Sequence, residues 1–406
     1  MSSASLEALR TIQVADIYKK SERIAQLRRE QDAIVFAYRD EHVAARGCAV
    51  ATTLPVTAMP VRTPAGATPA FFAGLLPEGR RLTSLRRAVK TSADDEFSLL
   101  LAVGRDTVGD VQVVAEGQPA SAPEPLVQVR ADWTEVRFAE LLADAGIVDP
   151  VALPGVQDKV SARVISLPVA RAHERFLLKL EPPEFPQLVE NEAFFLALAR
   201  EAGLPVVSAE VVRDAKGRAG LLVRRFDRVQ ARDGNVAALA CEDGCQVLGR
   251  WPADKYNLAA EEVVLGLARL CAAQAVAARS FYRQVCFAWL TGNGDLHAKN
   301  LSILEGPGDE WMPAPAYDLP ATVPYGDSSL ALPVQGRTRG LSRRHWMDFA
   351  AAIGLPVRSA AAVLDDLLVR TSGLEERLRA GALSLPQKTI ADWIAELRNR
   401  RRQARP

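Results

Sequence analysis

The sequence lacks a long hydrophobic run, an excess of charge of one sign and a histidine cluster. No apolar stretch reaches the roughly 20 residues of a membrane-spanning helix, so we expect no membrane partner. The formal net charge is +1, which excludes a bulk field that would attract nucleic acid or anionic membranes. The four histidines are scattered without the spacing of metal ligands, so no zinc site is expected.

Cysteines are also few, and the start of the chain has no signal-peptide pattern. Five cysteines are an odd number, which favours reduced thiols. Cys241 and Cys245 stand four positions apart, but the sequence offers no further ligands nearby. Structural thiols are therefore the favoured interpretation, with a metal or redox role as the alternative. Residues 1–10 show no basic segment followed by an apolar one, and we expect a cytoplasmic protein.

What is present is the composition of an ordinary globular protein of two or three domains, with 49% hydrophobic and 24% charged residues. Residues 11–18 and 33–38 are rich in β-formers, and a turn is predicted at 21–23. The Pro- and Ala-rich segment 115–126 predicts a subdomain boundary. Beyond residue 150, strands are predicted at 160–167 and 175–180. A helix at 188–202 follows, and then strands at 206–213 and 219–226.

The second half of the chain carries helical periodicity. The predicted helices are 260–277, 279–291, 342–354, 357–371 and 387–403. The basic end from Arg398 is expected to fray, either as a solvated charge run or as a phosphate contact. A β-rich half followed by a helical half predicts an α+β protein of two lobes, with a nucleotide in the cleft between them.

Residues 292–300, Gly-Asn-Gly-Asp-Leu-His-Ala-Lys-Asn, hold the strongest candidate chemistry. Phosphoryl transfer needs a carboxylate to accept the proton of the attacking hydroxyl, and further oxygen ligands to hold Mg²⁺. Asp295 fits the first role, while Asn300 and the downstream Asp318 fit the second. Lys299 could neutralise charge on the moving phosphoryl group. Alone, Asp-x₄-Asn is a weak pattern, and a polar loop with an Asn-Gly turn is the alternative.

Lys179 ends the apolar strand pattern Phe-Leu-Leu-Lys-Leu, where a lysine can contact the phosphates of a nucleotide. Glu192 in the following helix could orient it, with Glu190 as the competing candidate. The alternative is an edge-strand lysine whose head reaches water.

Two further segments could contact a nucleotide. Residues 154–159, Pro-Gly-Val-Gln-Asp-Lys, could turn backbone amides toward phosphate, although there is no Gly-x-Gly-x-x-Gly pattern and a simple turn is the alternative. Residues 222–228 end a strand and could offer backbone groups to adenine, with Phe226 packing on the ring. A charged strand end is the alternative there.

Taken together, these segments resemble the HipA family, the kinase toxins of bacterial type II toxin–antitoxin modules. The likeness runs from about residue 10 to about residue 390, and it is specific only in combination and order. The segments that carry it are Leu75–Glu78 with Val103–Gly109, Gly155–Lys159, Leu188–Glu192 with Ala202–Pro205, Arg225–Arg228, and Gly292–Asn300 with Ala316–Asp318.

The resemblance implies a bilobal fold related to the phosphoinositide-3/4-kinases. It implies an extra N-terminal subdomain at 1–118, a β-rich kinase N-lobe at 119–235 and an all-α C-terminal lobe at 236–406. It further implies ATP- and Mg²⁺-dependent serine/threonine kinase activity on a cellular protein, which arrests growth and underlies persistence. Aminoacyl-tRNA synthetases are targets of some members.

The family usually pairs with a small helix-turn-helix antitoxin (HipB-like) that binds operator DNA. One alternative is a nucleotide-binding pseudokinase or co-repressor that acts with such a DNA-binding partner. Another is a small-molecule or lipid kinase, which shares the same loop chemistry.

Carried over position by position, the resemblance makes Asp295 the proton acceptor and Asn300 and Asp318 the metal ligands. Ala152 stands where members often carry a regulatory serine, so either control differs here or the position has been altered. Arg224 replaces a commonly acidic residue, which a backbone contact should tolerate. The ATP-binding positions implied are Pro154, Gly155, Val156, Gln157, Asp158, Lys159, Lys179, Arg224, Arg225, Phe226, His297, Ala298, Lys299, Asn300, Tyr317 and Asp318.

Overall fold

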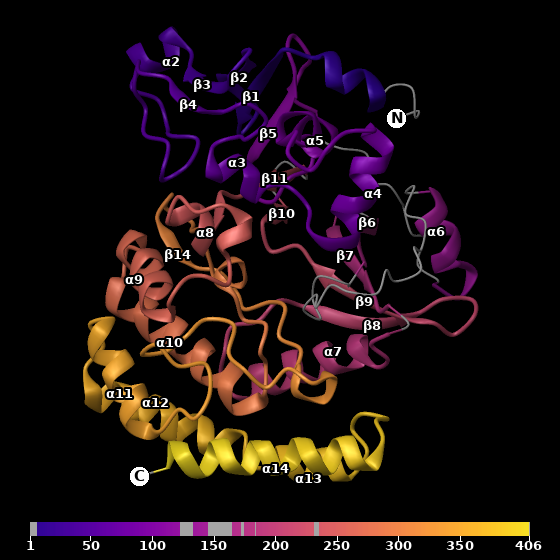
Figure 1. The fold of residues 1–406 in the computed structure, drawn as a ribbon, viewed down its shortest axis with the longest axis vertical. Helices are drawn as coiled ribbons and strands as arrows, with labels where there is room; N and C mark the ends of the chain where they lie inside the picture. The colour runs from indigo at the N-terminus through magenta and orange to yellow at the C-terminus, as the bar shows by residue number, and fades with distance from the viewer. Residues whose placement is uncertain are drawn as a thin grey trace.

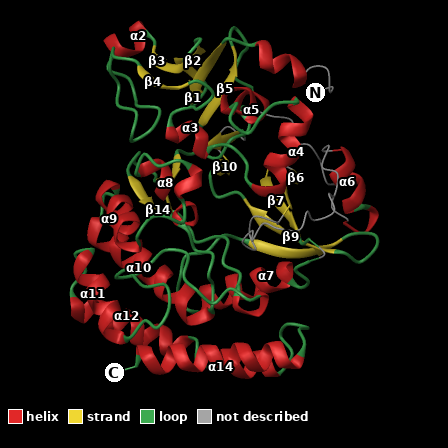
Figure 2. Ribbon diagram, in the orientation of Figure 1, coloured by secondary structure: helices red, strands yellow, loops and turns green. Residues whose placement is uncertain are grey.

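The computed structural model describes residues 6–121, 133–144, 165–171, 174–182, 184–230 and 235–405. In these ranges the chain forms an N-terminal body at the top of Figure 1, a second sheet at the middle right, and a largely helical body that ends in α14 at the bottom. Strands gather in the upper and middle parts, and helices dominate the lower part (Figure 2). This is the α+β, bilobal arrangement with an additional N-terminal part that the sequence predicts.

The N-terminal body is a five-stranded antiparallel sheet in the order β4-β3-β2-β1-β5. Phe72 and Leu100, from two of its helices, share a hydrophobic core with Ile17 and Leu27 of the sheet. Its elements are β1 (Val14–Lys19), β2 (Glu22–Arg29), β3 (Ala33–Tyr38), α2 (Asp40–Ala44), β4 (Val61–Pro64), α3 (Ala70–Gly74), α4 (Gly79–Val89), α5 (Glu96–Val103) and β5 (Val111–Ala115).

The turn between β1 and β2 lies one residue earlier than predicted. Lys20 and Ser21 both have positive φ, 48° and 70°, as a tight two-residue hairpin turn requires. Glu22 and Arg23 therefore belong to β2, a strand that was missed because charged residues make up half of it.

A second antiparallel sheet has the order β6-β7-β9-β8. Side chains alternate between its faces, so Phe176, Leu178 and Leu180 enter a core that includes α6. Leu177 and Lys179 face the other way, toward a cavity. The elements here are α6 (Phe138–Asp144), β6 (Ile165–Arg171), β7 (Glu174–Leu180), α7 (Leu188–Glu201), β8 (Ala209–Arg213), β9 (Ala219–Arg224), and the hairpin β10 (Arg228–Gln230) with β11 (Val236–Ala238).

The C-terminal body is mainly helical, but the expectation of an all-α lobe was wrong in one respect. A three-stranded sheet of β12 (Cys241–Asp243), β13 (Ser302–Glu305) and β14 (Trp311–Pro313) lies within it. These strands are too short to show a period of two in the sequence. The helices are α8 (Gly244–Val247), α9 (Ala260–Leu270), α10 (Gln274–Thr291), α11 (Arg343–Ala352), α12 (Val357–Arg370), α13 (Leu374–Arg379) and α14 (Gln387–Ala404).

Two predicted features of this body are corrected. The helix predicted at 260–277 ends at Leu270, and a new helix begins at Gln274. The basic end does not fray, because α14 continues to Ala404 and buries two of its arginines. Among the described residues, no helix is both long and apolar enough to cross a bilayer.

Arg400 and Arg401 are the buried arginines of α14. The guanidinium of Arg400 lies 4.1 Å from the ring centroid of Trp289 and donates to the carbonyl oxygen of the same residue at 2.9 Å. Arg401 donates to the hydroxyl of Thr371 at 2.7 Å. Both groups are committed to the core, so they are not available for a phosphate contact.

Candidate active site

A cavity of about 350 Å³ lies where the three bodies meet. The second sheet contributes Lys179, and the segment after β9 contributes Phe226. The C-terminal body contributes Asn300 and Asp318, which are far from these residues in the sequence. The fold therefore brings the predicted lysine, amide and distal carboxylate into one space.

Lys179 makes two ion pairs in this cavity. Its Nζ atom lies 2.7 Å from Glu192 Oε1 and 3.1 Å from Asp318 Oδ1. Burial alone would lower the pKa of Lys179, but the two carboxylates raise it, so the lysine stays charged. Of the two glutamates considered in the sequence, Glu190 instead pairs with Arg213 at 3.1 Å, on a more exposed part of α7.

Asp295 and Asn300 are held in one hydrogen-bonded loop. Gly292 ends α10 with a φ of 86°, and Asn293 Oδ1 then accepts the backbone N–H of Asp295 at 2.7 Å. Asn300 Nδ2 donates to the carbonyl oxygen of Asp295 at 2.9 Å. The hydroxyl of Tyr256 donates to Asp295 Oδ1 at 2.8 Å, and the aspartate is 1% exposed. The carboxylate is thus fixed by residues of the same body. Asp295 does not itself line the cavity and is connected to it through Asn300.

Asp318 lies in a strained backbone position, with a φ of 56° that is uncommon for a residue with a side chain. Burial opposes ionisation of this carboxyl, but the charge of Lys179 lowers its pKa below the ordinary value. An ionised carboxylate and the amide of Asn300 therefore line the same cavity.

His297 and Ala298 complete the loop. Burial and the charge of Lys255 lower the pKa of His297 to about 3, so the ring is neutral at physiological pH. The ring packs edge-on against Tyr256, with centroids 5.1 Å apart. Ala298 is fully buried and holds the loop through its backbone N–H, which donates to the carbonyl oxygen of Lys255 at 3.2 Å.

Lys299 belongs to a group of charges that we call the loop cluster. Its Nζ atom lies 2.8 Å from the carbonyl oxygen of Gly74, 3.3 Å from Asp243 Oδ2 and 3.5 Å from Glu78 Oε1. Glu78 also pairs with Lys255. The three N–H groups of Lys299 thus face three oxygens, two of them from the N-terminal body. The loop cluster comprises Gly74, Glu78, Asp243, Lys255 and Lys299.

The segment predicted to contact adenine is only partly free to do so. Phe226 stacks on Tyr317 with ring centroids 5.6 Å apart, and both line the cavity. The backbone N–H groups of Arg224 and Arg225 already donate to the carbonyl oxygens of Ser208 and Arg175, so these two donors are occupied. The side chain of Arg224 is exposed.

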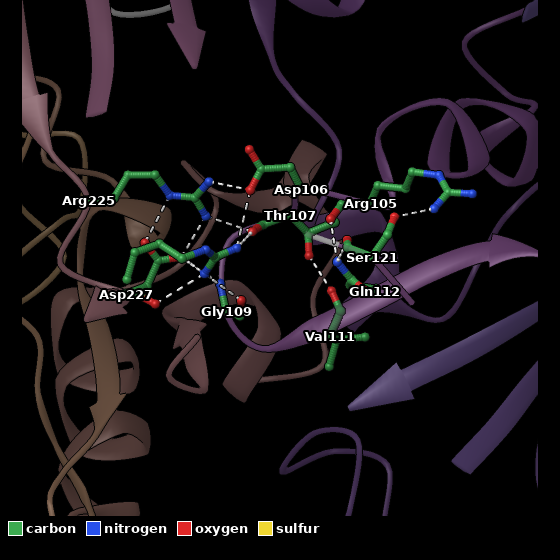
Figure 3. Close-up of polar contacts among 10 residues, drawn as sticks. Arg105, Asp106, Thr107, Gly109, Val111, Gln112, Ser121, Arg225 and Asp227 are labelled. Atoms are coloured by element: carbon green, nitrogen blue, oxygen red, sulfur yellow. Dashed lines mark hydrogen bonds and ion pairs between the residues drawn. The ribbon is translucent and has the colours of Figure 1, made fainter. Parts of the chain in front are cut away.

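Arg225 instead belongs to what we call the hinge cluster, in which the segment after β9 meets the N-terminal body. Its guanidinium contacts Asp106 Oδ1 at 2.6 Å, the carbonyl oxygen of Thr107 at 2.7 Å and Asp227 Oδ2 at 2.7 Å. Figure 3 shows these side chains converging across the boundary between the two bodies. The hinge cluster comprises Asp106, Thr107, Gly109, Arg225, Asp227 and Arg228.

Some sequence predictions are not tested by this geometry. The segment Pro154–Lys159 and the position of Ala152 lie outside the described residues.

Cys241 and Cys245 are buried free thiols, and burial raises the pKa of Cys245 to about 12. The described part of the chain holds no group of three or more histidine, cysteine and acidic residues that could bind a metal.

Sequence reasoning missed the contribution of the N-terminal body to the cavity. Glu78, Arg81 and the segment 106–108 all line it. The signal was present, since 75–78 and 103–109 were among the segments that carried the family resemblance without an assigned role. Tyr256 gave no signal, because nothing in the sequence places it beside Asp295.

Comparison with known proteins bears on this geometry. A HipA-like C-terminal domain matches residues 151–373 and a HipA N-terminal domain matches residues 15–114. The protein Y4mE of Sinorhizobium fredii is 33% identical over 310 residues, which are 71% of this chain and 73% of that protein. The serine/threonine-protein kinase toxin HipA of Shewanella oneidensis is 28% identical over 281 residues, 63% of this chain and 64% of that protein.

A solved structure also matches nearly the whole chain. It is the complex of Shewanella oneidensis HipA with HipB and operator DNA, with a TM-score of 0.75 at 21% identity, covering 95% of this chain and 96% of that one. At this identity the likeness shows the fold, including the N-terminal body and both lobes.

Proposed function

Because the chain belongs to the HipA family, we propose that it is a serine/threonine kinase that transfers the γ-phosphate of ATP to a cellular protein. The observation that carries this proposal is the convergence of Lys179, Asn300 and Asp318 on one cavity, with Asp295 hydrogen-bonded to Asn300. Phosphoryl transfer depends on positioning and charge rather than on covalent chemistry, and these residues supply both.

The donor set of the cavity suits a magnesium nucleotide. Mg²⁺ prefers oxygen ligands, which the carboxylate of Asp318 and the amide of Asn300 can offer. Because Asn300 Nδ2 donates to Asp295, its Oδ1 atom is the end left for a cation. When bound, magnesium ATP supplies the phosphoryl group and a positive charge against the phosphate oxygens.

The residues of the chain then have separate tasks. Asp295 accepts the proton of the attacking serine or threonine hydroxyl, and Tyr256 holds its carboxylate in place before the acceptor arrives. Lys179 contacts the phosphates as a point charge that Glu192 keeps oriented. Phe226 and Tyr317 pack against the adenine.

Two roles expected from the sequence change in this proposal. Lys299 holds the loop to the N-terminal body rather than serving chiefly to neutralise the phosphoryl group, because its donors already face three oxygens. Arg225 joins the bodies, and its guanidinium is not a nucleotide contact. His297, Ala298 and Arg224 keep the positions beside the nucleotide that the family resemblance assigns.

In the same proposal, the N-terminal subdomain comprises residues 1–118, the kinase N-lobe 119–235 and the C-lobe 236–406. The chain acts as the toxin of a toxin–antitoxin module with a small helix-turn-helix antitoxin and its operator DNA. The support is that Shewanella oneidensis HipA was solved in complex with HipB and operator DNA. Its target is a serine or threonine of a cellular protein, with an aminoacyl-tRNA synthetase as the first to try.

The test is transfer of label from γ-labelled ATP with Mg²⁺ into a cell extract, followed by phosphoamino acid analysis. Wild type should label serine or threonine, and Asp295→Asn should lower the rate by about a thousandfold, as expected for loss of a general base. Glu190→Gln is the matched control, since it removes a carboxylate from the surface of α7. Equal transfer by wild type and Asp295→Asn would contradict the proposal.

The alternative of a pseudokinase or co-repressor predicts ATP binding with no transfer by wild type. Its support in the sequence was the basic end of the chain, and the burial of Arg400 and Arg401 weakens that support.

A further inference from the structure

The N-terminal body forms one wall of the candidate nucleotide cavity. The end of the loop before α4, the residue Arg81 within α4, and the segment 106–108 all line the cavity. A kinase site made only from two lobes would not include these residues. The N-terminal body therefore contributes its own side chains to this cavity.

The first turn of α4 is fixed on both sides. Just before the helix, Glu78 pairs with Lys255 and Lys299 of the C-terminal body. One residue before Arg81, Arg80 donates to both carboxylate oxygens of Glu184 at 3.0 and 3.2 Å. The helix backbone at Arg81 is thus held in place at the cavity by ion pairs to two other parts of the chain.

Arg81 differs from the other arginines of this boundary in having no partner. Arg80, Arg225 and Arg228 each donate to carboxylates. Within the ranges that the structure describes, the guanidinium of Arg81 has neither a hydrogen bond nor an ion pair. Burial lowers its pKa from the ordinary value, and Asp106 opposes that effect without contacting it.

Asp106 lies near Arg81 but accepts its hydrogen bonds from two other arginines. Its Oδ1 atom already accepts from Arg225 at 2.6 Å and from Arg228 at 3.3 Å. A guanidinium has five N–H donors, and those of half-buried Arg81, on the cavity wall, are left without a protein acceptor. These donors are free to pair with an anion that enters the cavity.

We propose that Arg81 binds the phosphate chain of the nucleotide, an inference that rests on the proposed kinase function and adds a residue of the N-terminal body to that site. Guanidinium groups pair with phosphate oxygens through two parallel hydrogen bonds. Lys179 approaches the same cavity from the second sheet, so the phosphates are held from two bodies at once. The N-terminal body is then part of the nucleotide site.

The experiment measures equilibrium binding of magnesium ATP, ADP and adenosine by the full chain, without turnover. The variants are Arg81→Gln, Arg81→Lys and, as the matched control, Arg87→Gln, which removes the same charge from an exposed position of α4. Arg81→Gln should lower the affinity for both phosphorylated ligands about tenfold or more and leave the affinity for adenosine within about twofold of wild type. Arg81→Lys should restore part of the affinity, and Arg87→Gln should bind all three like wild type.

Thermal unfolding without ligand accompanies the binding assay, to show that the variants are folded. The proposal is overturned if Arg81→Gln binds magnesium ATP like wild type, or if its affinity for adenosine falls by the same factor as its affinity for magnesium ATP. If wild type binds ATP through Arg81 but transfers no phosphate, the kinase function fails while this inference stands. If wild type binds neither ATP nor ADP, both fail.

Discussion

The N-terminal body meets the rest of the chain at two clusters of charge that are built differently. In the hinge cluster the side chains of Arg225 and Asp227 are 6% and 4% exposed, and Asp227 accepts from Gly109, Arg225 and Arg228. In the loop cluster Lys299 and Asp243 are 12% and 11% exposed, whereas the side chain of Glu78 is 32% exposed. Its buried Oε1 atom accepts no hydrogen bond from the described residues.

The difference separates two kinds of contact. A buried and fully paired network holds two bodies in one arrangement, and breaking it leaves charges without partners. A cluster in which one carboxylate, that of Glu78, is partly exposed and has an unused acceptor can adjust when a ligand enters beside Asn300. We infer that the hinge cluster supports the fold and that the loop cluster supports the chemistry.

The largest expected effect is at the hinge cluster. Asp227→Asn leaves Arg225 and Arg228 buried with only Asp106 as a carboxylate partner. The free energy of unfolding should fall by about 3–5 kcal/mol, as for other broken buried pairs. Urea denaturation measures it. Glu30→Gln is the control, because it breaks an exposed pair with Arg62 and should cost less than about 1 kcal/mol. Equal losses for the two variants would contradict the comparison.

Acid sharpens the same prediction. Burial opposes ionisation of Asp227, but Arg225 and Arg228 lower its pKa to about 2, from an ordinary value of 3.8. Below pH 3.8 the carboxylate of Asp227 is protonated in the unfolded chain but stays ionised in the folded chain. The stabilisation is therefore complete above that pH and is lost as the pH falls toward 2. By pH 3 the stability advantage of wild type over Asp227→Asn should shrink by about 1 kcal/mol.

At the loop cluster we expect a smaller loss of stability and, in addition, a loss of activity. Glu78→Gln removes the charge that holds Lys255 and Lys299. The free energy of unfolding should fall by about 1–2 kcal/mol, because the carboxylate is partly exposed. Turnover should fall about tenfold, since small displacements of a catalytic loop are costly.

The readout that separates positioning from folding is the ratio of kcat to the affinity for magnesium ATP. Affinity should stay within about threefold of wild type, because Lys179 and Asp318 are untouched by Glu78→Gln and Arg80 still holds the first turn of α4 on Glu184. If kcat is unchanged while stability falls, the loop cluster is only structural and the distinction between the two clusters fails.

The sequence predicted the fold class and the strand that carries Lys179, because an apolar run of strand length and a family resemblance were both present. It did not predict β12, β13 and β14, whose lengths of three or four residues carry no period. It also misjudged the basic end of α14. Composition alone does not reveal that Arg400 stacks on Trp289 from another helix.

For the site, the spacing of residues within one segment could be used for prediction, whereas contacts between distant segments could not be predicted. Asp295 and Asn300 could be predicted from one loop, and Glu192 was named as the partner of Lys179 with Glu190 as the competing candidate. The choice between Glu192 and Glu190 needed the direction in which α7 faces the sheet. Glu78 and Arg81 reach the cavity through the packing of a separate body, which no local pattern reports.

The most direct test of the account is a crystal structure of the full chain with Mg²⁺ and a non-hydrolysable ATP analogue. The account predicts the triphosphate between Lys179 and Arg81, with the metal held by Asn300 and Asp318 at about 2.1 Å. A nucleotide bound outside this cavity, or a metal that touches neither Asn300 nor Asp318, would contradict it.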